Sequence, residues 1–164
     1  QLDQQLTVGF SDKVTRLLQD AVGRGAEVLT GGGTPPGPGY FVEPTVLSGV
    51  DPQAALMSTE IFGPLAAVTT FESIDEVVAR ANATPWGLVA YVMTTDIDRA
   101  FYLTERLETG MVGLNTGVVS TPSAPFGGVK ESGLGREGGR TGIEEFLETK
   151  YLSIPRRTPI GVHA

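Results

Sequence analysis

Asn115-Thr-Gly-Val-Val-Ser-Thr-Pro-Ser-Ala-Pro-Phe-Gly-Gly-Val-Lys-Glu-Ser-Gly-Leu-Gly-Arg-Glu137 is a long stretch without a helical or an alternating apolar pattern. Loops of this length are uncommon in compact domains and are usually functional or disordered. Apolar side chains that prefer burial interrupt the stretch, which favours an ordered loop; they are Val118, Val119, Phe126 and Leu134. Apolar segments stand on both sides, at 111–114 and 143–147. We therefore expect the flanking elements to hold this loop against a site.

Composition narrows the classes of protein to which the chain can belong. The 164 residues are 40% hydrophobic, enough to build the core of one or at most two domains. The formal net charge of −7 argues against binding to nucleic acid or to an anionic membrane surface. No apolar run approaches the roughly 18 residues of a membrane span, and no signal-peptide pattern opens the sequence. We expect a cytoplasmic protein.

The residues that bind metals or act as nucleophiles are scarce. Cysteine is absent, and His163 is the single histidine. The chain itself therefore offers no disulfide, thiolate zinc site or cysteine nucleophile, and a histidine metal site or a Ser-His triad is not expected. The sequence begins with Gln1 rather than methionine, from which we expect a fragment of a longer protein.

Periodicity predicts alternating helices and strands. Helices are expected over 11–24, 73–81, 95–109 and 141–148, and strands over 26–30, 40–50, 65–71, 88–93, 111–114 and 151–154. Gly25 is expected to end the first helix, and Ser73 and Thr141 to open capping boxes. Because Pro44 interrupts residues 40–50, this segment is expected to be an edge strand or an extended segment. The alternation predicts an α/β fold with a mainly parallel sheet and flanking helices. In such sheets, sites form beyond the carboxyl ends of strands, where the loop after Leu114 lies.

Two glycine-rich motifs are interpreted as turns rather than as phosphate sites. Gly31-Gly-Gly33 lacks the Lys-Ser/Thr pair and the following helix that a phosphate-binding loop needs. Gly133-Leu-Gly-Arg-Glu-Gly138 matches the dinucleotide pattern G-x-G-x-x-G, but no hydrophobic strand precedes it and no acidic residue stands near Thr158. Turns that need positive φ explain these glycines better.

Four residues are candidates for a small-molecule site. Glu60 and Phe62 share a face if their segment is extended, so a carboxylate and a ring would be available for sugar hydroxyls and a flat heterocycle. A solvated glutamate beside a core phenylalanine is the alternative, and the spacing alone favours it. Ser120 and Phe126 offer a hydroxyl and an aromatic wall in the long loop, although ordinary turn chemistry is equally compatible with the composition. The residues alone define no catalytic set.

Several blocks of the sequence resemble the C-terminal part of the NAD(P)-dependent aldehyde dehydrogenase superfamily. The blocks are Glu60-Ile-Phe-Gly-Pro64, Asn82-x-x-x-Trp-Gly-Leu88, Gly113-x-Asn115 and Pro125-Phe-Gly-Gly-Val-Lys-x-Ser-Gly-Leu-Gly-Arg-Glu137. Within the superfamily, residues 115–128 are most similar to succinate-semialdehyde dehydrogenases. The resemblance extends from Leu6 to Ile154 and covers only the last part of a usual family member.

The resemblance implies roles for the four candidates. Glu60 would hold the hydroxyls of the nicotinamide ribose, and Phe62 would pack near the nicotinamide ring of NAD or NADP. Ser120 would offer a hydroxyl to the distal carboxylate of the aldehyde, which suits a charge-assisted hydrogen bond. Phe126 would line the aldehyde tunnel.

The resemblance also implies a domain organisation. Residues 1–148 would be the C-terminal part of the catalytic domain, and residues 149–164 an oligomerisation strand and tail in a homodimer or homotetramer. The family oxidises aldehydes through attack of a cysteine thiolate, hydride transfer and hydrolysis of the thioester. The cofactor-binding domain and the nucleophile region would lie outside this chain, which would hold no catalytic residue and be inactive alone. The alternatives are a non-catalytic truncated module for binding or subunit assembly, and a small-molecule binding domain.

Overall fold

The computed structural model describes residues 8–155, and these residues form two compact units. The first unit contains the described residues up to Pro85 together with Phe101–Leu107. The second contains Trp86–Ala100 and the described residues from Glu108 onward. Predictions that concern His163 and most of the C-terminal tail lie outside the described residues. The α/β class predicted from the sequence is confirmed, with two parallel and two antiparallel strand pairs.

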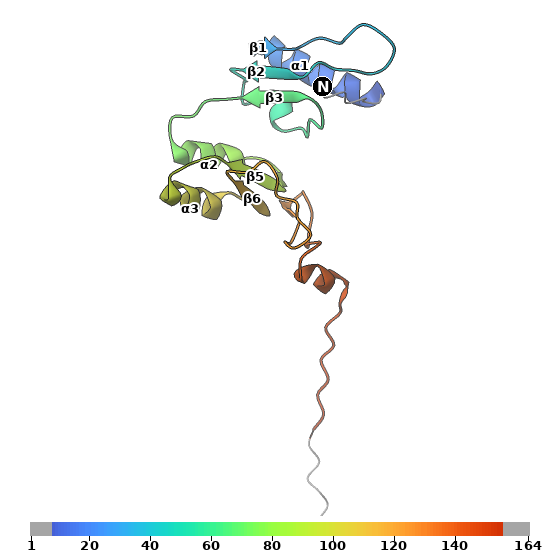
Figure 1. The fold of residues 1–164 in the computed structure, drawn as a ribbon, viewed down its shortest axis with the longest axis vertical. Coiled ribbons are helices and arrows are strands. Elements are labelled where there is room, and N and C mark those ends of the chain that lie inside the picture. The colour runs from blue at the N-terminus through green and yellow to red at the C-terminus, as the bar shows by residue number, and fades with distance from the viewer. Residues whose placement is uncertain (1–7, 156–164) are drawn as a thin grey trace, which may run out of the picture. The chain divides into compact units, whose positions relative to one another are not determined.

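The first unit is a three-stranded sheet with a helix packed beside it (Figure 1). Its elements are α1 (Val8–Gly23), β1 (Glu27–Thr30), β2 (Thr45–Ser48), η1 (Ala55–Met57), β3 (Leu65–Val68) and α2 (Ile74–Asn82). Strand β2 pairs antiparallel with β1 and parallel with β3. The apolar face of α1 and the centre of β2 bury Val14 and Leu47 completely, and these two side chains belong to one hydrophobic cluster. Burial of this cluster provides the main stabilisation of the unit.

Helix α1 ends as the sequence predicts. Gly25 has a φ of 100°, its N–H donates to the Val22 carbonyl (2.9 Å), and the Ala26 N–H donates to the Ala21 carbonyl (3.0 Å). This pair of hydrogen bonds is the Schellman motif, which needs a residue in the left-handed region at the position of Gly25.

Asp20 links α1 to the segment after β2. Its carboxylate accepts hydrogen bonds from the Ala55 N–H (2.8 Å) and from Arg24 Nε (3.0 Å). The backbone donor and the guanidinium lower the pKa of Asp20 below its ordinary value, because both stabilise the charged form.

The prediction of an edge strand at 40–50 is wrong. Strand β2 lies in the middle of the sheet, between β1 and β3. Pro44 stands directly before β2, so its missing N–H removes no hydrogen bond from the ladder. The first ladder donor is Thr45, whose N–H binds the Pro64 carbonyl at 2.8 Å.

The glycine loop after β1 is closed by side chains rather than open to an anion. The Gly32 N–H donates to Thr45 Oγ1 (2.9 Å), and the Gly33 N–H donates to Glu43 Oε2 (3.0 Å). Thr45 Oγ1 in turn donates to the Glu43 carbonyl (2.7 Å). Since these backbone donors are already engaged, the structure agrees with a turn at this position.

Thr45→Val is expected to lower the free energy of unfolding by about 1–3 kcal/mol, because valine keeps the shape but removes the partner of the Gly32 N–H and of the Glu43 carbonyl in two part-buried hydrogen bonds. Thr45 is 2% exposed. Urea unfolding followed by circular dichroism measures the change. The matched control is Thr70→Val, at an exposed threonine whose hydroxyl has no partner among residues 8–155, and it should change the value by less than about 0.5 kcal/mol. Equal effects of the two substitutions would contradict the role of the Thr45 hydroxyl.

The two predicted capping boxes have different outcomes. Ser73 caps α2 and accepts the Glu76 N–H at 3.1 Å, while Glu76 reaches back to the Glu72 N–H at 2.8 Å. Thr141 caps no α-helix, because the segment forms a short 3-10 helix, η2 (Thr141–Phe146), without a side-chain cap. The Glu145 side chain binds the backbone of the preceding turn instead.

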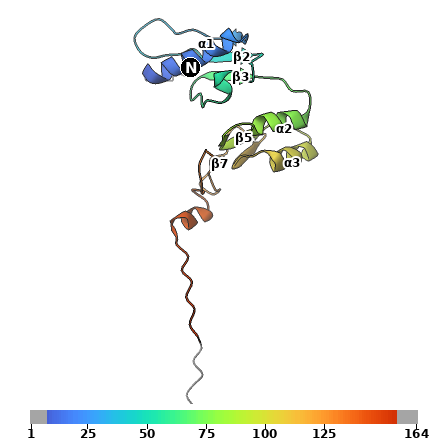
Figure 2. The ribbon, with the colours of Figure 1, turned by 180° about the vertical axis from the view of Figure 1, so that it is seen from behind.

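The second unit carries the long loop. Its elements are β4 (Trp86–Gly87), β5 (Val89–Val92), β6 (Met111–Leu114), β7 (Val129–Lys130) and η2, and helix α3 (Ile97–Arg106) is divided between the two units. Strands β5 and β6 are parallel (Figure 1). Strands β4 and β7 are antiparallel, and β7 is labelled in the reverse view (Figure 2). The strand predicted at 151–154 forms no ladder within the described residues, and Tyr151 is 87% exposed. A strand needs a neighbour, and this segment has none in residues 8–155.

Within residues 8–155, no helix combines the length and the apolar character needed to cross a bilayer. The same part of the chain has no group of three histidine, aspartate or glutamate side chains placed to hold a metal ion.

Candidate active site

The long loop begins at Asn115, whose side chain and backbone form hydrogen bonds across the ends of the parallel strands β5 and β6. Asn115 follows β6 with a φ of 52°, a left-handed conformation that asparagine tolerates better than most residues. Its Oδ1 accepts the Thr94 N–H (2.9 Å), its Nδ2 donates to the Thr94 carbonyl (2.8 Å), and its own N–H donates to the Val92 carbonyl (2.8 Å). The hydrogen bonds of Asn115 therefore extend the ladder by one step beyond the carboxyl ends of β5 and β6. The loop starts at this residue.

The loop ends at a backbone bridge. Phe126 and Glu137 exchange two hydrogen bonds, with N–H to O distances of 2.7 and 2.8 Å. Between them, the chain turns through β7 and the glycine-rich motif, in which Gly133, Gly135 and Gly138 have positive φ. The interpretation of this motif as a turn is confirmed.

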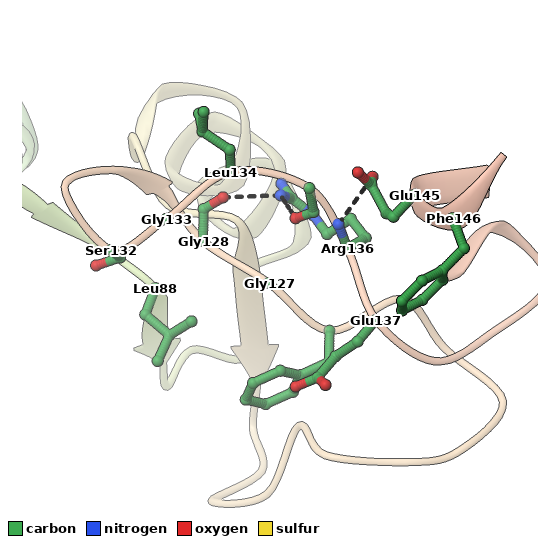
Figure 3. Close-up of a pocket in the computed structure, with 12 residues that line it drawn as sticks. Leu88, Gly127, Gly128, Ser132, Gly133, Leu134, Arg136, Glu137, Glu145 and Phe146 are labelled. Atoms are coloured by element: carbon green, nitrogen blue, oxygen red, sulfur yellow. Dashed lines mark hydrogen bonds between the residues drawn. The ribbon is translucent and has the colours of Figure 1, made fainter. Parts of the chain in front are cut away.

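Arg136 holds the turn together from inside, as Figure 3 shows. Its Nη1 donates to the Gly128 carbonyl (2.7 Å) and to the Gly135 carbonyl (2.8 Å), and its N–H donates to Glu145 Oε1 (3.1 Å). The guanidinium thus satisfies backbone carbonyls of the loop.

The structure brings the two residues expected to bind the aldehyde into one pocket. Ser120 and Phe126 both line a pocket of about 360 Å³, and Glu137 lies in its wall. Phe126 and Glu137 also line a second pocket of about 350 Å³ inside the glycine-rich turn (Figure 3). Sequence reasoning did not place Glu137 at this site, because its pairing with Phe126 spans a turn whose register no local pattern reveals.

The two residues expected to bind the cofactor lie in the first unit. Phe62 is 70% exposed and has a φ of 47°, so the segment is not extended at Phe62, and the condition under which Glu60 and Phe62 would share a face is not met. The first two turns of α1 support this segment. Lys13 Nζ donates to the Glu60 carbonyl (2.9 Å) and lies 5.2 Å from the ring centre of Phe10, which is 6.2 Å from that of Phe62.

The exposed groups of this segment fit a nicotinamide ribose. The Glu60 carboxylate is exposed and has no hydrogen-bond or ion-pair partner within residues 8–155, so it is available to hydroxyl donors. The Phe62 ring offers a flat apolar surface, and a non-glycine residue held at positive φ is a strained conformation that clusters at functional sites.

Sequence comparison identifies the family. The sequence model described as "Aldehyde dehydrogenase family" matches residues 9–152. A succinate-semialdehyde dehydrogenase from Paenarthrobacter nicotinovorans is 49% identical over 146 residues, which are 89% of this chain and 32% of that protein. A glutarate-semialdehyde dehydrogenase from Pseudomonas putida is 50% identical over 142 residues, which are 87% of this chain and 29% of that protein.

A solved structure gives the same assignment. The crystal structure of an NADP-dependent enzyme from Escherichia coli superposes with a TM-score of 0.85 at 45% identity, over 88% of this chain and 30% of that one. The chain thus spans about a third or less of the length of the proteins it matches. The family match over most of the sequence shows that this chain belongs to the aldehyde dehydrogenase family.

Proposed function

We propose that this chain is the C-terminal part of an enzyme that oxidises an aldehyde bearing a carboxylate at its other end. Succinic semialdehyde is the expected substrate, and NAD+ or NADP+ the oxidant. The names of both reported relatives describe such semialdehydes. The observation that carries the proposal is the pocket shared by Ser120 and Phe126, in which a hydroxyl donor stands beside an aromatic wall.

The proposed roles follow from the chemistry of the side chains. Ser120 donates its O–H to the distal carboxylate, and charge-assisted hydrogen bonds of this kind are about twice as strong as neutral ones. Phe126 packs against the methylenes between carboxylate and aldehyde. Glu60 accepts hydrogen bonds from the ribose hydroxyls of the cofactor, and Phe62 packs near the nicotinamide. When bound, the nicotinamide accepts the hydride that the aldehyde loses.

The nucleophile of the reaction must come from outside these 164 residues, because the sequence holds no cysteine. In this proposal residues 1–148 belong to the catalytic domain, and residues 149–164 include a strand for subunit assembly in a homo-oligomer. Exposed apolar side chains support a role within a larger assembly rather than as a free-standing module. Among them are Leu134 at 99% exposure and Phe146 at 82%.

Ser120→Ala tests the proposal in the enzyme that carries this chain. The ratio of kcat/KM for succinic semialdehyde to kcat/KM for propanal is expected to fall about 10- to 100-fold, because a hydrogen bond to a charged group is worth about 1.5–3 kcal/mol. Propanal has no carboxylate, so its kcat/KM should stay close to the wild-type value.

Ser123→Ala is the matched control, since Ser123 belongs to the same loop but does not line the pocket of Ser120. It should leave the ratio unchanged. A Ser120→Ala enzyme with the wild-type ratio would remove the basis for a substrate that carries a carboxylate.

A further inference from the structure

The loop that carries Ser120 is seated on strand β6 at a point between its two fixed ends. A Cβ built on Gly113 would lie 2.9 Å from Val119 Cγ1 and 2.7 Å from Tyr91 Cδ1. Val119 is half-buried, whereas its neighbour Val118 is 71% exposed. Val119 is therefore the side chain by which this part of the loop packs against the β5–β6 pair.

Gly113 is required for space and not for backbone conformation. Its φ lies outside the left-handed region, and it pairs with Tyr91 in a regular parallel register. It is also buried. Val119 and the Tyr91 ring occupy the volume that a side chain at position 113 would need.

The next residue after Val119 is Ser120, whose hydroxyl is the proposed carboxylate donor. The position of that hydroxyl in the pocket depends on how closely Val119 approaches β6. Asn115 fixes the start of the loop through Thr94, and the bridge at Phe126 fixes its end. Between these ends, the Val118 N–H donates to the Thr116 hydroxyl and the Ala124 N–H donates to the Thr121 carbonyl, both within the loop, while the Pro122 carbonyl accepts the Gly139 N–H at 3.1 Å. Before Ser120, the packing of Val119 is the contact that ties the loop to β6.

We propose that Gly113 and Val119 form a seat that sets the reach of Ser120 and thereby selects the length of the substrate between its aldehyde and its carboxylate. This inference rests on the proposed function and adds a determinant of chain length to it. In a Gly113→Ala variant, the new Cβ would lie 2.9 Å from Val119 Cγ1, and widening that distance to an ordinary 3.5–4.0 Å would move the loop by about 1 Å. Such a shift is comparable to the length of one methylene, the difference between succinic and glutaric semialdehyde.

Gly113→Ala in the whole enzyme tests the seat. The ratio of kcat/KM for succinic semialdehyde to kcat/KM for glutaric semialdehyde is expected to change about tenfold, the lower end of what one methylene contributes to discrimination. Because both substrates present the same aldehyde to the same enzyme, a smaller folded fraction cancels in this ratio. A purely structural role would lower both values together.

Two further variants sharpen the test. Gly113→Ala combined with Val119→Ala removes the Val119 methyl that the new Cβ meets and leaves the contact with Tyr91, so the ratio should return part of the way to the wild-type value. Gly117→Ala is the matched control, because Gly117 lies in the same loop, a Cβ there meets nothing within 4 Å, and its φ is not positive. It should leave the ratio unchanged.

The outcomes separate this inference from the proposed function. A Ser120→Ala enzyme that still prefers succinic semialdehyde over propanal by the wild-type ratio would overturn the proposed function. If Ser120→Ala acts as expected while Gly113→Ala behaves like Gly117→Ala, only the seat is overturned. If Gly113→Ala does not fold, Val119→Ala is compared with Val118→Ala as its control. Equal ratios of kcat/KM for succinic and glutaric semialdehyde in these two variants would overturn the seat.

Discussion

The purified 164-residue chain is expected to form no NAD(P)H from succinic semialdehyde and NAD(P)+ above the rate of a buffer blank. The proposed reaction needs a thiolate to attack the aldehyde, and the sequence has no cysteine. Side chains that bind the ends of cofactor and substrate do not replace a nucleophile. Absorbance at the nicotinamide band over several hours measures the rate, and the whole enzyme that carries this sequence is the positive control.

A rate above the blank that scales with the concentration of the chain would contradict this expectation. An immunoblot of the natural protein from its source addresses the alternative of a free-standing module. An antibody against the chain should detect a natural protein about three times heavier than 17.3 kDa, if these residues belong to an enzyme as long as the relatives. A natural protein of the chain's own mass would favour a module for binding or subunit assembly.

Glu60→Gln is expected to weaken binding of the nicotinamide cofactor to the whole enzyme about 10- to 100-fold. The amide keeps the size of the side chain but replaces a charged acceptor, and hydrogen bonds to charged groups contribute about 1.5–3 kcal/mol. The dissociation constant from the fluorescence of bound NAD(P)H measures the effect without turnover.

Glu72→Gln provides the control for charge, since Glu72 is an exposed carboxylate of the same unit whose side chain has no partner within residues 8–155. It should leave the dissociation constant within about twofold, as expected for a surface site outside the contact. If Glu60→Gln and Glu72→Gln bind the cofactor equally well, Glu60 does not contact the ribose.

Features that depend on neighbours in the sequence could be predicted. The end of α1 follows from Gly25, which supplies the left-handed residue of the Schellman motif. The start of α2 follows from Ser73 and Glu76, which satisfy backbone donors of the first turn. The roles of Ser120 and Phe126 were implied by the resemblance to aldehyde dehydrogenases and stay a prediction, and the structure places both residues in the lining of one pocket.

Features that depend on distant pairing could not be predicted in this way. Strand β2 is central because it pairs with both β1 and β3. No local sequence pattern near Pro44 indicates that β3 is a second partner. The bridge between Phe126 and Glu137 depends on a register across a turn. The left-handed backbone of Phe62 is supported by Phe10 and Lys13 of α1, residues far away in the sequence.

The division of α3 between the two units determines what proteolysis can separate. The chain passes from one unit to the other after Pro85, again within α3 after Ala100, and once more after Leu107. A nick after Pro85 therefore leaves Phe101–Leu107, which belongs to the first unit, in the piece that carries the second unit, and freeing either unit whole also requires a cut within α3. Limited digestion is thus expected to give pieces whose ends do not coincide with the two units.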